Sequence, residues 1–175
     1  MSELTLLPAP SSLSRDAFVQ VYGEIYEHSP WIAALAWEAG LSQAQDTPAG
    51  LASAMGQVLN AASAERQLEV IRAHPDLAGK AALAGKLTQD SSREQAGAGL
   101  DQCSPEEFAR FERLNEAYKA RFGFPFVMAV KGQDRYAILT AFATRLDNSL
   151  DEERRTAIEQ VNRIALLRLQ ARAGN

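Results

Sequence analysis

The strongest constraint on the fold of this chain is a helix signature that begins at Ser104. Pro105 follows the serine directly, and Glu107 lies three residues after it. This order is typical of a helix start, because the serine and glutamate side chains pair with backbone amides of the first turn. Apolar residues then recur every three or four positions and share one helical face: Phe108, Phe111, Leu114, Tyr118 and Phe122. The segment predicts a long amphipathic helix.

Other segments carry similar helix starts. Ser14 and Thr47 are predicted N-caps, and Thr47 is followed by Pro48. A helix through Leu68 is predicted to end near His74, because the residue before a proline is disfavoured in the helical region.

The last predicted helix opens with a second capping box, Ser149 and Glu152. Its apolar stripe consists of Ile158, Val161, Ala165 and Leu169. On this helix, the residues predicted to face solvent are Glu152, Glu153, Arg154 and Arg155.

No strand pattern with period two and no internal repeat accompanies these helices. The chain has 175 residues, of which 46% are apolar, so it has about the length of one domain and enough apolar residues for a core. We therefore expect an all-α fold: a single-domain compact bundle of about seven to nine helices that spans residues 1–175.

Composition excludes several classes of protein. With 18 Lys and Arg against 22 Asp and Glu, the net charge is −4, which argues against a nucleic-acid backbone as the main partner. No apolar run approaches the roughly 20 residues of a membrane helix, and no signal peptide is expected. Strong zinc ligands are limited to His28, His74 and Cys103, so we expect no metal site and interpret Cys103 as structural.

Residues 122–130, Phe-Gly-Phe-Pro-Phe-Val-Met-Ala-Val, do not fit a helix. Gly123 and Pro125 interrupt the pattern, yet the segment is too apolar for an exposed loop. Its backbone therefore needs hydrogen-bond partners outside a helical ladder. Two interpretations are open: a ligand site, or a connection that fills the core.

His74 is the first candidate for chemistry. It is predicted at the C-terminal end of a helix, where the macrodipole favours a protonated imidazole, and Pro75 makes the next peptide rigid. Histidine suits proton transfer near neutral pH. The alternative, favoured by this feature alone, is a histidine that caps the last helical carbonyls.

Residues 91–95, Ser-Ser-Arg-Glu-Gln, are the second candidate. On spacing alone, the favoured interpretation is that Ser91 and Glu94 form a capping box. The functional alternative is a helix N-terminus that binds an anion, where Glu94 orients His74 and Gln95 binds an amide of the ligand.

Arg168 is the third candidate. It lies among Leu166, Leu167 and Leu169. It either extends to the surface along its alkyl stem or faces inward to bind a carboxylate with two hydrogen bonds. Arg163 is a rival for the second role.

Taken together, the order of these segments resembles the family of 2-oxo-4-hydroxy-4-carboxy-5-ureidoimidazoline (OHCU) decarboxylases. The resemblance covers the chain from about Phe18 to Leu169. It rests on residues 27–31, 73–77, 91–95, 114–126, 145–148 and 164–169.

The resemblance implies an all-helical homodimer that converts OHCU to (S)-allantoin and carbon dioxide without a cofactor. It implies that His74 and Glu94 are catalytic. The implied substrate-binding residues are Pro75, Ser91, Ser92, Arg93, Glu94, Gln95, Phe126, Val127, Met128, Ala129, Val130 and Arg168. Peroxisomal members of the family end in a targeting tripeptide, whereas this chain ends Ala-Gly-Asn, so we expect a cytoplasmic protein.

Three other functions are weighed against this one. A helical module could bind a ureide or purine-derived ligand without turning it over. A helical interaction protein could use Leu166, Leu167 and Leu169 as a partner face, although no heptad series supports it. A DNA-binding protein fits the charge least. The enzyme hypothesis requires that the side chains of His74 and Arg168 converge with a carboxylate on one dry cavity.

Overall fold

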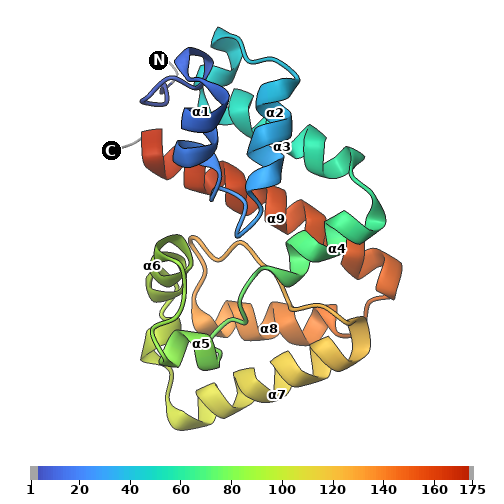
Figure 1. Cartoon of the computed structure of the whole chain (residues 1–175). Coiled ribbons are helices and arrows are strands. Elements are labelled where there is room, and N and C mark those ends of the chain that lie inside the picture. The colour runs from blue at the N-terminus through green and yellow to red at the C-terminus, as the bar shows by residue number, and fades with distance from the viewer. Residues whose placement is uncertain (1–3, 174–175) are drawn as a thin grey trace. The chain divides into compact units, whose positions relative to one another are not determined.

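The computed structural model describes residues 4–173, and this part of the chain contains helices and no strand (Figure 1). The all-α prediction is confirmed, with nine α-helices in the described range. The elements are η1 (Pro10–Ser12), α1 (Arg15–Tyr22), α2 (Pro30–Glu38), η2 (Gln43–Asp46), α3 (Pro48–Ala61), α4 (Ala64–Arg72), α5 (Lys80–Leu83), α6 (Gln89–Gly97), η3 (Leu100–Gln102), α7 (Pro105–Phe122), α8 (Arg135–Arg145) and α9 (Leu150–Ala173). The targeting expectations rest partly on residues 1–3 and 174–175, which lie outside the described range.

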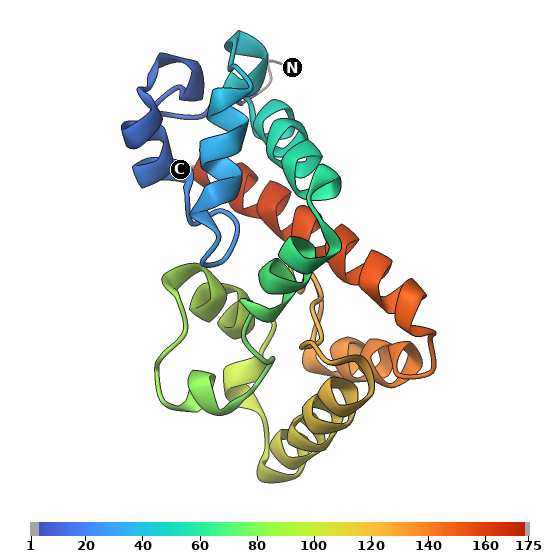
Figure 2. The ribbon, with the colours of Figure 1, turned by 45° about the vertical axis from the view of Figure 1, so that its right-hand side comes forward.

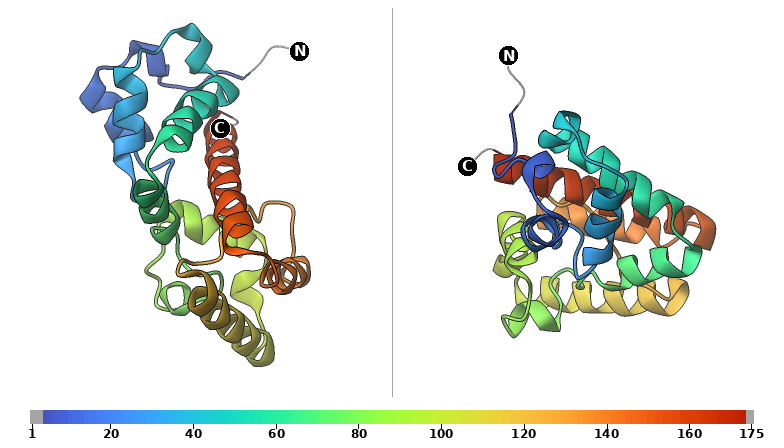
Figure 3. Two further views of the ribbon diagram at one scale, coloured as in Figure 1. Left: turned by 90° about the vertical axis from the view of Figure 1, so that its right-hand side faces the viewer. Right: turned by 45° about the horizontal axis from the view of Figure 1, so that its top comes forward.

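The chain divides into two compact units. The first comprises Met1–Ala73 and Val161–Asn175, and the second comprises His74–Gln160. Helix α9 is continuous and contributes residues to both units (Figure 3). The single domain expected over residues 1–175 stays a prediction.

In the first unit, α1 packs against α2 and α2 against α3 (Figure 2). The C-terminal part of α9 contacts α3, where the Nδ2 of Asn162 donates to the Oδ1 of Asn60 at 3.1 Å. The predicted stripe residues Val161, Ala165 and Leu169 are all buried. The apolar face of α9 therefore helps to form the core of this unit.

In the second unit, α7 and α8 lie alongside each other (Figures 1 and 2). Buried rings of these two helices and of the segment between them form one aromatic cluster: Tyr118, Phe122, Phe124, Phe126 and Phe142. The Phe126 and Phe142 rings are stacked with centroids 3.9 Å apart. Residues 123–130 are not helical, and all of them are buried except Gly123 and the half-buried Met128.

The predicted helix starts at Ser14, Thr47, Ser104 and Ser149 are confirmed. Each side-chain hydroxyl accepts a hydrogen bond from the amide three residues later. Helix α4 also ends as predicted, since Arg72 is its last residue. Local signals thus located most helix boundaries.

The capping box predicted at Ser91 and Glu94 is wrong. Helix α6 begins at Gln89, and its N-cap is Thr88, whose hydroxyl accepts from the Ser91 amide at 3.2 Å. Ser91 and Glu94 therefore lie within the helix. The threonine three residues earlier makes the cap that the spacing had suggested for Ser91.

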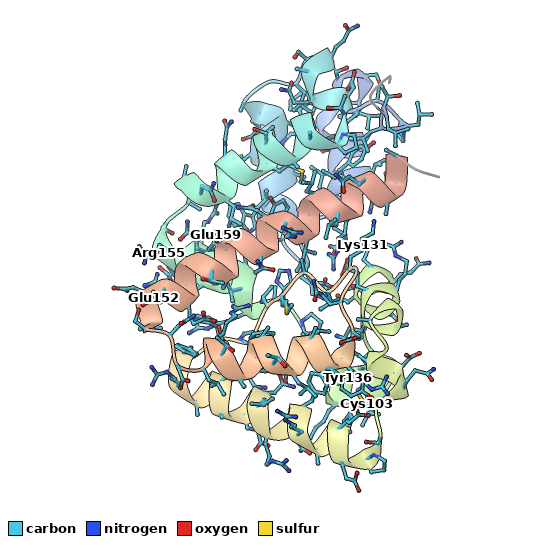
Figure 4. The ribbon with its side chains drawn as sticks, turned by 180° about the vertical axis from the view of Figure 1, so that it is seen from behind. Cys103, Lys131, Tyr136, Glu152, Arg155 and Glu159 are labelled. Carbon is cyan, nitrogen blue, oxygen red and sulfur yellow. The ribbon has the colours of Figure 1, made fainter. Side chains whose placement is uncertain are left out.

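The solvent-facing position predicted for Glu153 is also wrong, because its side chain is 0% exposed. Arg154 is half-buried rather than exposed. Glu152 and Arg155 project outward from α9 as predicted (Figure 4). Glu153 was predicted to face solvent because it is charged. It is buried instead, because it has hydrogen-bond partners on other elements.

Among residues 4–173, no helix is long and apolar enough to span a membrane.

Candidate active site

His74 lies directly after helix α4 and is only 8% exposed. Ala73 is the C-cap of this helix, and its amide donates to the carbonyls of Glu69 and Val70 at 3.0 and 3.3 Å. A buried imidazole therefore leads into the rigid Pro75 peptide, and its burial was not part of either interpretation of this histidine.

Two side chains hold the backbone of residues 76–78, which follow His74 and Pro75. The Gln95 amide accepts from the Ala78 N–H at 3.0 Å and donates to the Asp76 carbonyl at 3.1 Å. Asn115 donates to the Leu77 carbonyl at 2.9 Å. The family resemblance implies that Gln95 binds substrate, whereas the structure gives both ends of its amide a partner in this turn.

Helix α6 presents two different faces. Ser91 and Gln95, one turn apart, are buried, and Glu94 is half-buried. Ser92 and Arg93 are exposed, and the Arg93 guanidinium pairs with Asp90 at 3.1 Å. The five residues predicted to bind substrate thus divide between an inner and an outer face.

Three backbone groups of residues 126–130 have partners within the protein, and one of them is the Val130 carbonyl, which accepts from the Gln133 amide at 3.0 Å. The Nη1 of Arg145 donates to the Val127 carbonyl at 2.8 Å, and the Ala129 amide donates to the Oε1 of Gln160 at 2.9 Å. We had expected the backbone of this segment to bind ligand. The proposal that this backbone binds ligand is therefore limited to the backbone groups that have no such partner.

Arg145 belongs to a buried network centred on Glu153. The Oε1 of Glu153 accepts from the Tyr118 hydroxyl at 2.5 Å and from the Nε of Arg145 at 2.9 Å, while its Oε2 accepts from Asn148 at 2.9 Å. Burial, followed by the hydrogen bond to Glu153, raises the pKa of Tyr118. Sequence reasoning noted Arg145 and Asn148 only as part of a family motif and missed this network.

Arg168 lies in the first unit and faces inward. Its side chain is 2% exposed, and its Nη2 donates to the Oε2 of Glu27, itself 1% exposed, at 2.8 Å. Arg163, the rival candidate for the inward-facing role, is exposed. Of the two arginines, Arg168 is therefore the one that faces inward. Glu27 was not recognised as the partner, because it lies 141 residues away along the chain.

The predicted convergence of the site stays a prediction. His74 and Glu94 belong to the second unit, and Arg168 belongs to the first.

A cavity of about 300 Å³ lies within the second unit. Its walls are mainly alanine and leucine side chains, and Ser92, Gln95 and Cys103 also line it. Cys103 directly precedes the N-cap of α7 (Figure 4), and burial, followed by the charge of Glu107, raises the pKa of its thiol. A protonated thiol is a poor nucleophile, which supports a structural role.

No group of three or more His, Cys, Asp or Glu residues within 4–173 is arranged to hold a metal ion.

Comparison with known proteins shows relatives along nearly the whole chain. The family described as OHCU decarboxylase matches residues 11–170. A protein of Haloferax volcanii named 2-oxo-4-hydroxy-4-carboxy-5-ureidoimidazoline decarboxylase is 46% identical over 172 residues, which cover 98% of each chain.

Solved structures show the same fold. A crystal structure of (S)-allantoin synthase matches with a TM-score of 0.75 and 30% identity over 96% of this chain. This chain spans 53% of that protein. A crystal structure of OHCU decarboxylase in the presence of (S)-allantoin matches with a TM-score of 0.66 over 83% of this chain and 92% of the other. At 20% identity, this second match bears on the fold alone.

Proposed function

Because this chain belongs to the OHCU decarboxylase family, we propose that His74 and Glu94 carry out the proton transfer of its reaction. The enzyme is a carboxy-lyase of urate degradation that converts OHCU to (S)-allantoin and carbon dioxide. The observation that supports the proposal is the burial of His74 at the end of α4, beside a turn held by Gln95 and Asn115.

The reaction needs one proton at one face of the substrate. Cleavage of the bond between the ring carbon and the carboxylate releases carbon dioxide and leaves an electron pair on that carbon. The carbonyl and imine groups of the substrate delocalise this pair. The pair moves into the adjacent ring imine and leaves an enol. Protonation of the neighbouring ring carbon, which carries the ureido group, from one side then gives a single enantiomer as the enol hydroxyl loses its proton to become the carbonyl, so the donor must be held in a defined place. A buried imidazole is suited to this role near neutral pH.

Glu94 is proposed to orient the imidazole of His74 and to favour its protonated form, because an adjacent carboxylate stabilises a positive charge. Its place inside α6, one residue before the Gln95 that contacts the turn, supports this role. A helix is a rigid support for a positioning group.

Substrate binding is proposed for the residues that the family resemblance implies. Arg168 would bind an anionic or carbonyl oxygen, because a guanidinium offers parallel donors to such groups. The segment at Phe126, Met128 and Val130 would contact the amide groups of the substrate, and its phenylalanines would exclude water. The remaining proposed residues are Pro75, Ser91, Ser92, Arg93, Gln95, Val127 and Ala129; among them Gln95, Val127 and Ala129 already have partners within the protein.

The direct test is His74→Asn with freshly generated OHCU. Since OHCU also decays spontaneously without stereocontrol, we expect the variant to yield racemic allantoin at the uncatalysed rate. Circular dichroism at 220–230 nm and a thermal melt would verify that the variant is folded. Formation of (S)-allantoin at the wild-type rate would remove His74 from the mechanism.

Glu94→Gln separates the charge of Glu94 from its shape. We expect kcat to fall roughly 100-fold, within the range typical of groups that assist proton transfer. Wild-type kcat in this variant would contradict the proposed role of the carboxylate.

Two further properties implied by the resemblance are also proposals, namely a homodimer and a cytoplasmic location. Light scattering on the purified chain would measure the oligomeric state, and fractionation of the source cells would locate the protein.

A further inference from the structure

The turn that follows His74 is anchored at three consecutive residues. Gln95 on α6 holds the Asp76 carbonyl and the Ala78 amide, and Asn115 on α7 holds the Leu77 carbonyl. Gln95 and Asn115 are 5% and 4% exposed. Two helices of the second unit thus fix the chain that leaves the histidine.

The conformation of this turn is one that a free chain would rarely adopt. Ala78 has a φ of +50°, in the left-handed region that alanine disfavours. At Gly79, an added Cβ would lie 2.7 Å from the Cβ of Asp76, so the chain approaches itself too closely for any other residue. Such a backbone persists only where surrounding groups hold it, and strained positions cluster at functional sites.

The stability of the fold does not by itself explain why a buried asparagine stands at position 115. Its Oδ1 is buried and has no hydrogen-bond partner within residues 4–173. An unpaired buried acceptor has lost its hydrogen bonds to water without replacement, and this cost offsets much of what the bond to Leu77 contributes. A leucine of similar size would avoid this cost but would release the turn.

We propose that Gln95 and Asn115 are positioning residues, which fix the turn at 76–78 and thereby the placement of the His74 imidazole. This proposal rests on the proposed role of His74 in proton transfer. For Gln95 it replaces the substrate-binding role that the family resemblance implies, because the amide holds the backbone of Asp76 and Ala78.

A third contact to the turn contributes less. The Nζ of Lys119 lies 2.7 Å from the Oδ2 of Asp76, but the two side chains are 45% and 27% exposed. An ion pair this accessible to water is expected to contribute little to the stability of the turn. The buried amides are therefore the anchors to test.

The test uses Asn115→Leu and Gln95→Met, which keep the approximate shape and remove the hydrogen bonds. We expect kcat to fall roughly 10- to 100-fold, because small displacements of a reacting group have effects of this size. KM should stay close to the wild-type value. The fraction of (S)-allantoin should fall too, because spontaneous decay competes better with a slower enzyme.

Tyr22→Phe is the matched control. It removes a hydrogen bond from a buried side chain to a backbone carbonyl, that of Pro8, in the first unit. We expect unchanged kcat and KM, together with a small loss of thermal stability. Gln95→Glu is an intermediate variant, since it keeps the acceptor for Ala78 and loses the donor to Asp76.

The outcomes separate this inference from the proposed function. A rise in KM at constant kcat in Gln95→Met would show that Gln95 binds substrate, and wild-type kcat in folded Asn115→Leu would overturn its positioning role. If His74→Asn keeps activity, the proposed function fails instead, whatever Asn115→Leu shows.

Discussion

Each unit of this molecule contains an arginine–glutamate pair whose carboxylate is buried, and the two pairs are built differently. Arg145 and Glu153 lie in the second unit with Nε and Oε1 2.9 Å apart, and Arg168 and Glu27 lie in the first unit with Nη2 and Oε2 2.8 Å apart. Distance and burial alone would give both pairs the same role.

Their partners distinguish them. Glu153 accepts three hydrogen bonds, and the Arg145 guanidinium also holds the Val127 carbonyl and lies 4.3 Å from the centroid of the Phe126 ring. This pair connects α7, α8 and α9 with the non-helical segment. Arg168 bonds to Glu27 and has a 3.4 Å contact from its Nη1 to the Ile25 carbonyl, a residue of the first unit. The contacts of Arg145 with several elements give its pair a structural role, whereas Arg168 is proposed to bind substrate.

The largest expected effect is the loss of stability in Glu153→Ala. The variant leaves the Arg145 charge buried without its carboxylate, which is expected to cost about 3–5 kcal/mol in the free energy of unfolding. Chemical denaturation followed by circular dichroism would measure it. Glu159→Ala, at an exposed position on the same helix (Figure 4), is the control and should change little. If Glu153→Ala lowers the free energy of unfolding by less than about 1 kcal/mol, the structural role of the Arg145–Glu153 pair is contradicted.

Arg168→Ala should instead affect the reaction. We expect kcat/KM to fall by the equivalent of about 2–5 kcal/mol, mainly through a higher KM, as for loss of one partner of a buried charged contact. Steady-state kinetics at several OHCU concentrations would measure this. Arg163→Ala, at an exposed position of α9, serves as its control. Unchanged kinetics in Arg168→Ala would make this pair structural as well.

The smallest effect is expected from Tyr118→Phe, which removes one hydrogen bond to Glu153 and should cost about 1 kcal/mol near neutral pH. Since the folded state raises the pKa of the Tyr118 phenol above its ordinary value, the phenol's contribution is complete below about pH 10 and is lost as the pH rises through the folded pKa. Unfolding measured from pH 7 to 11 should show the gap between wild type and variant narrowing at alkaline pH. A constant gap would contradict this assignment.

Much of the fold was predictable because helix signals are local. Ser104 and Glu107 lie three residues apart and form the predicted reciprocal bonds. The same locality explains the error at α6, where Thr88 and Ser91 both suited an N-cap and only the structure distinguished them. The error at Glu153 has another cause, since its partners lie 5, 8 and 35 residues away.

The candidate site was predictable in part. Residue types and their order indicated His74, Glu94 and Arg168, and the family match supports the reaction. The burial of Arg168 against Glu27 and the hold of Gln95 on residues 76–78 were not visible in the sequence. These contacts join segments 141 and 17 to 19 residues apart, and no periodicity links such positions.

By itself, the sequence determined that this chain is helical, where most of its helices begin and which residues could transfer a proton, because capping and periodicity act over a few residues. Only the tertiary structure decided which charged side chains are buried and which backbone groups the amides of Gln95 and Asn115 hold. The physical reason is that burial and long-range hydrogen bonding depend on which helices pack together.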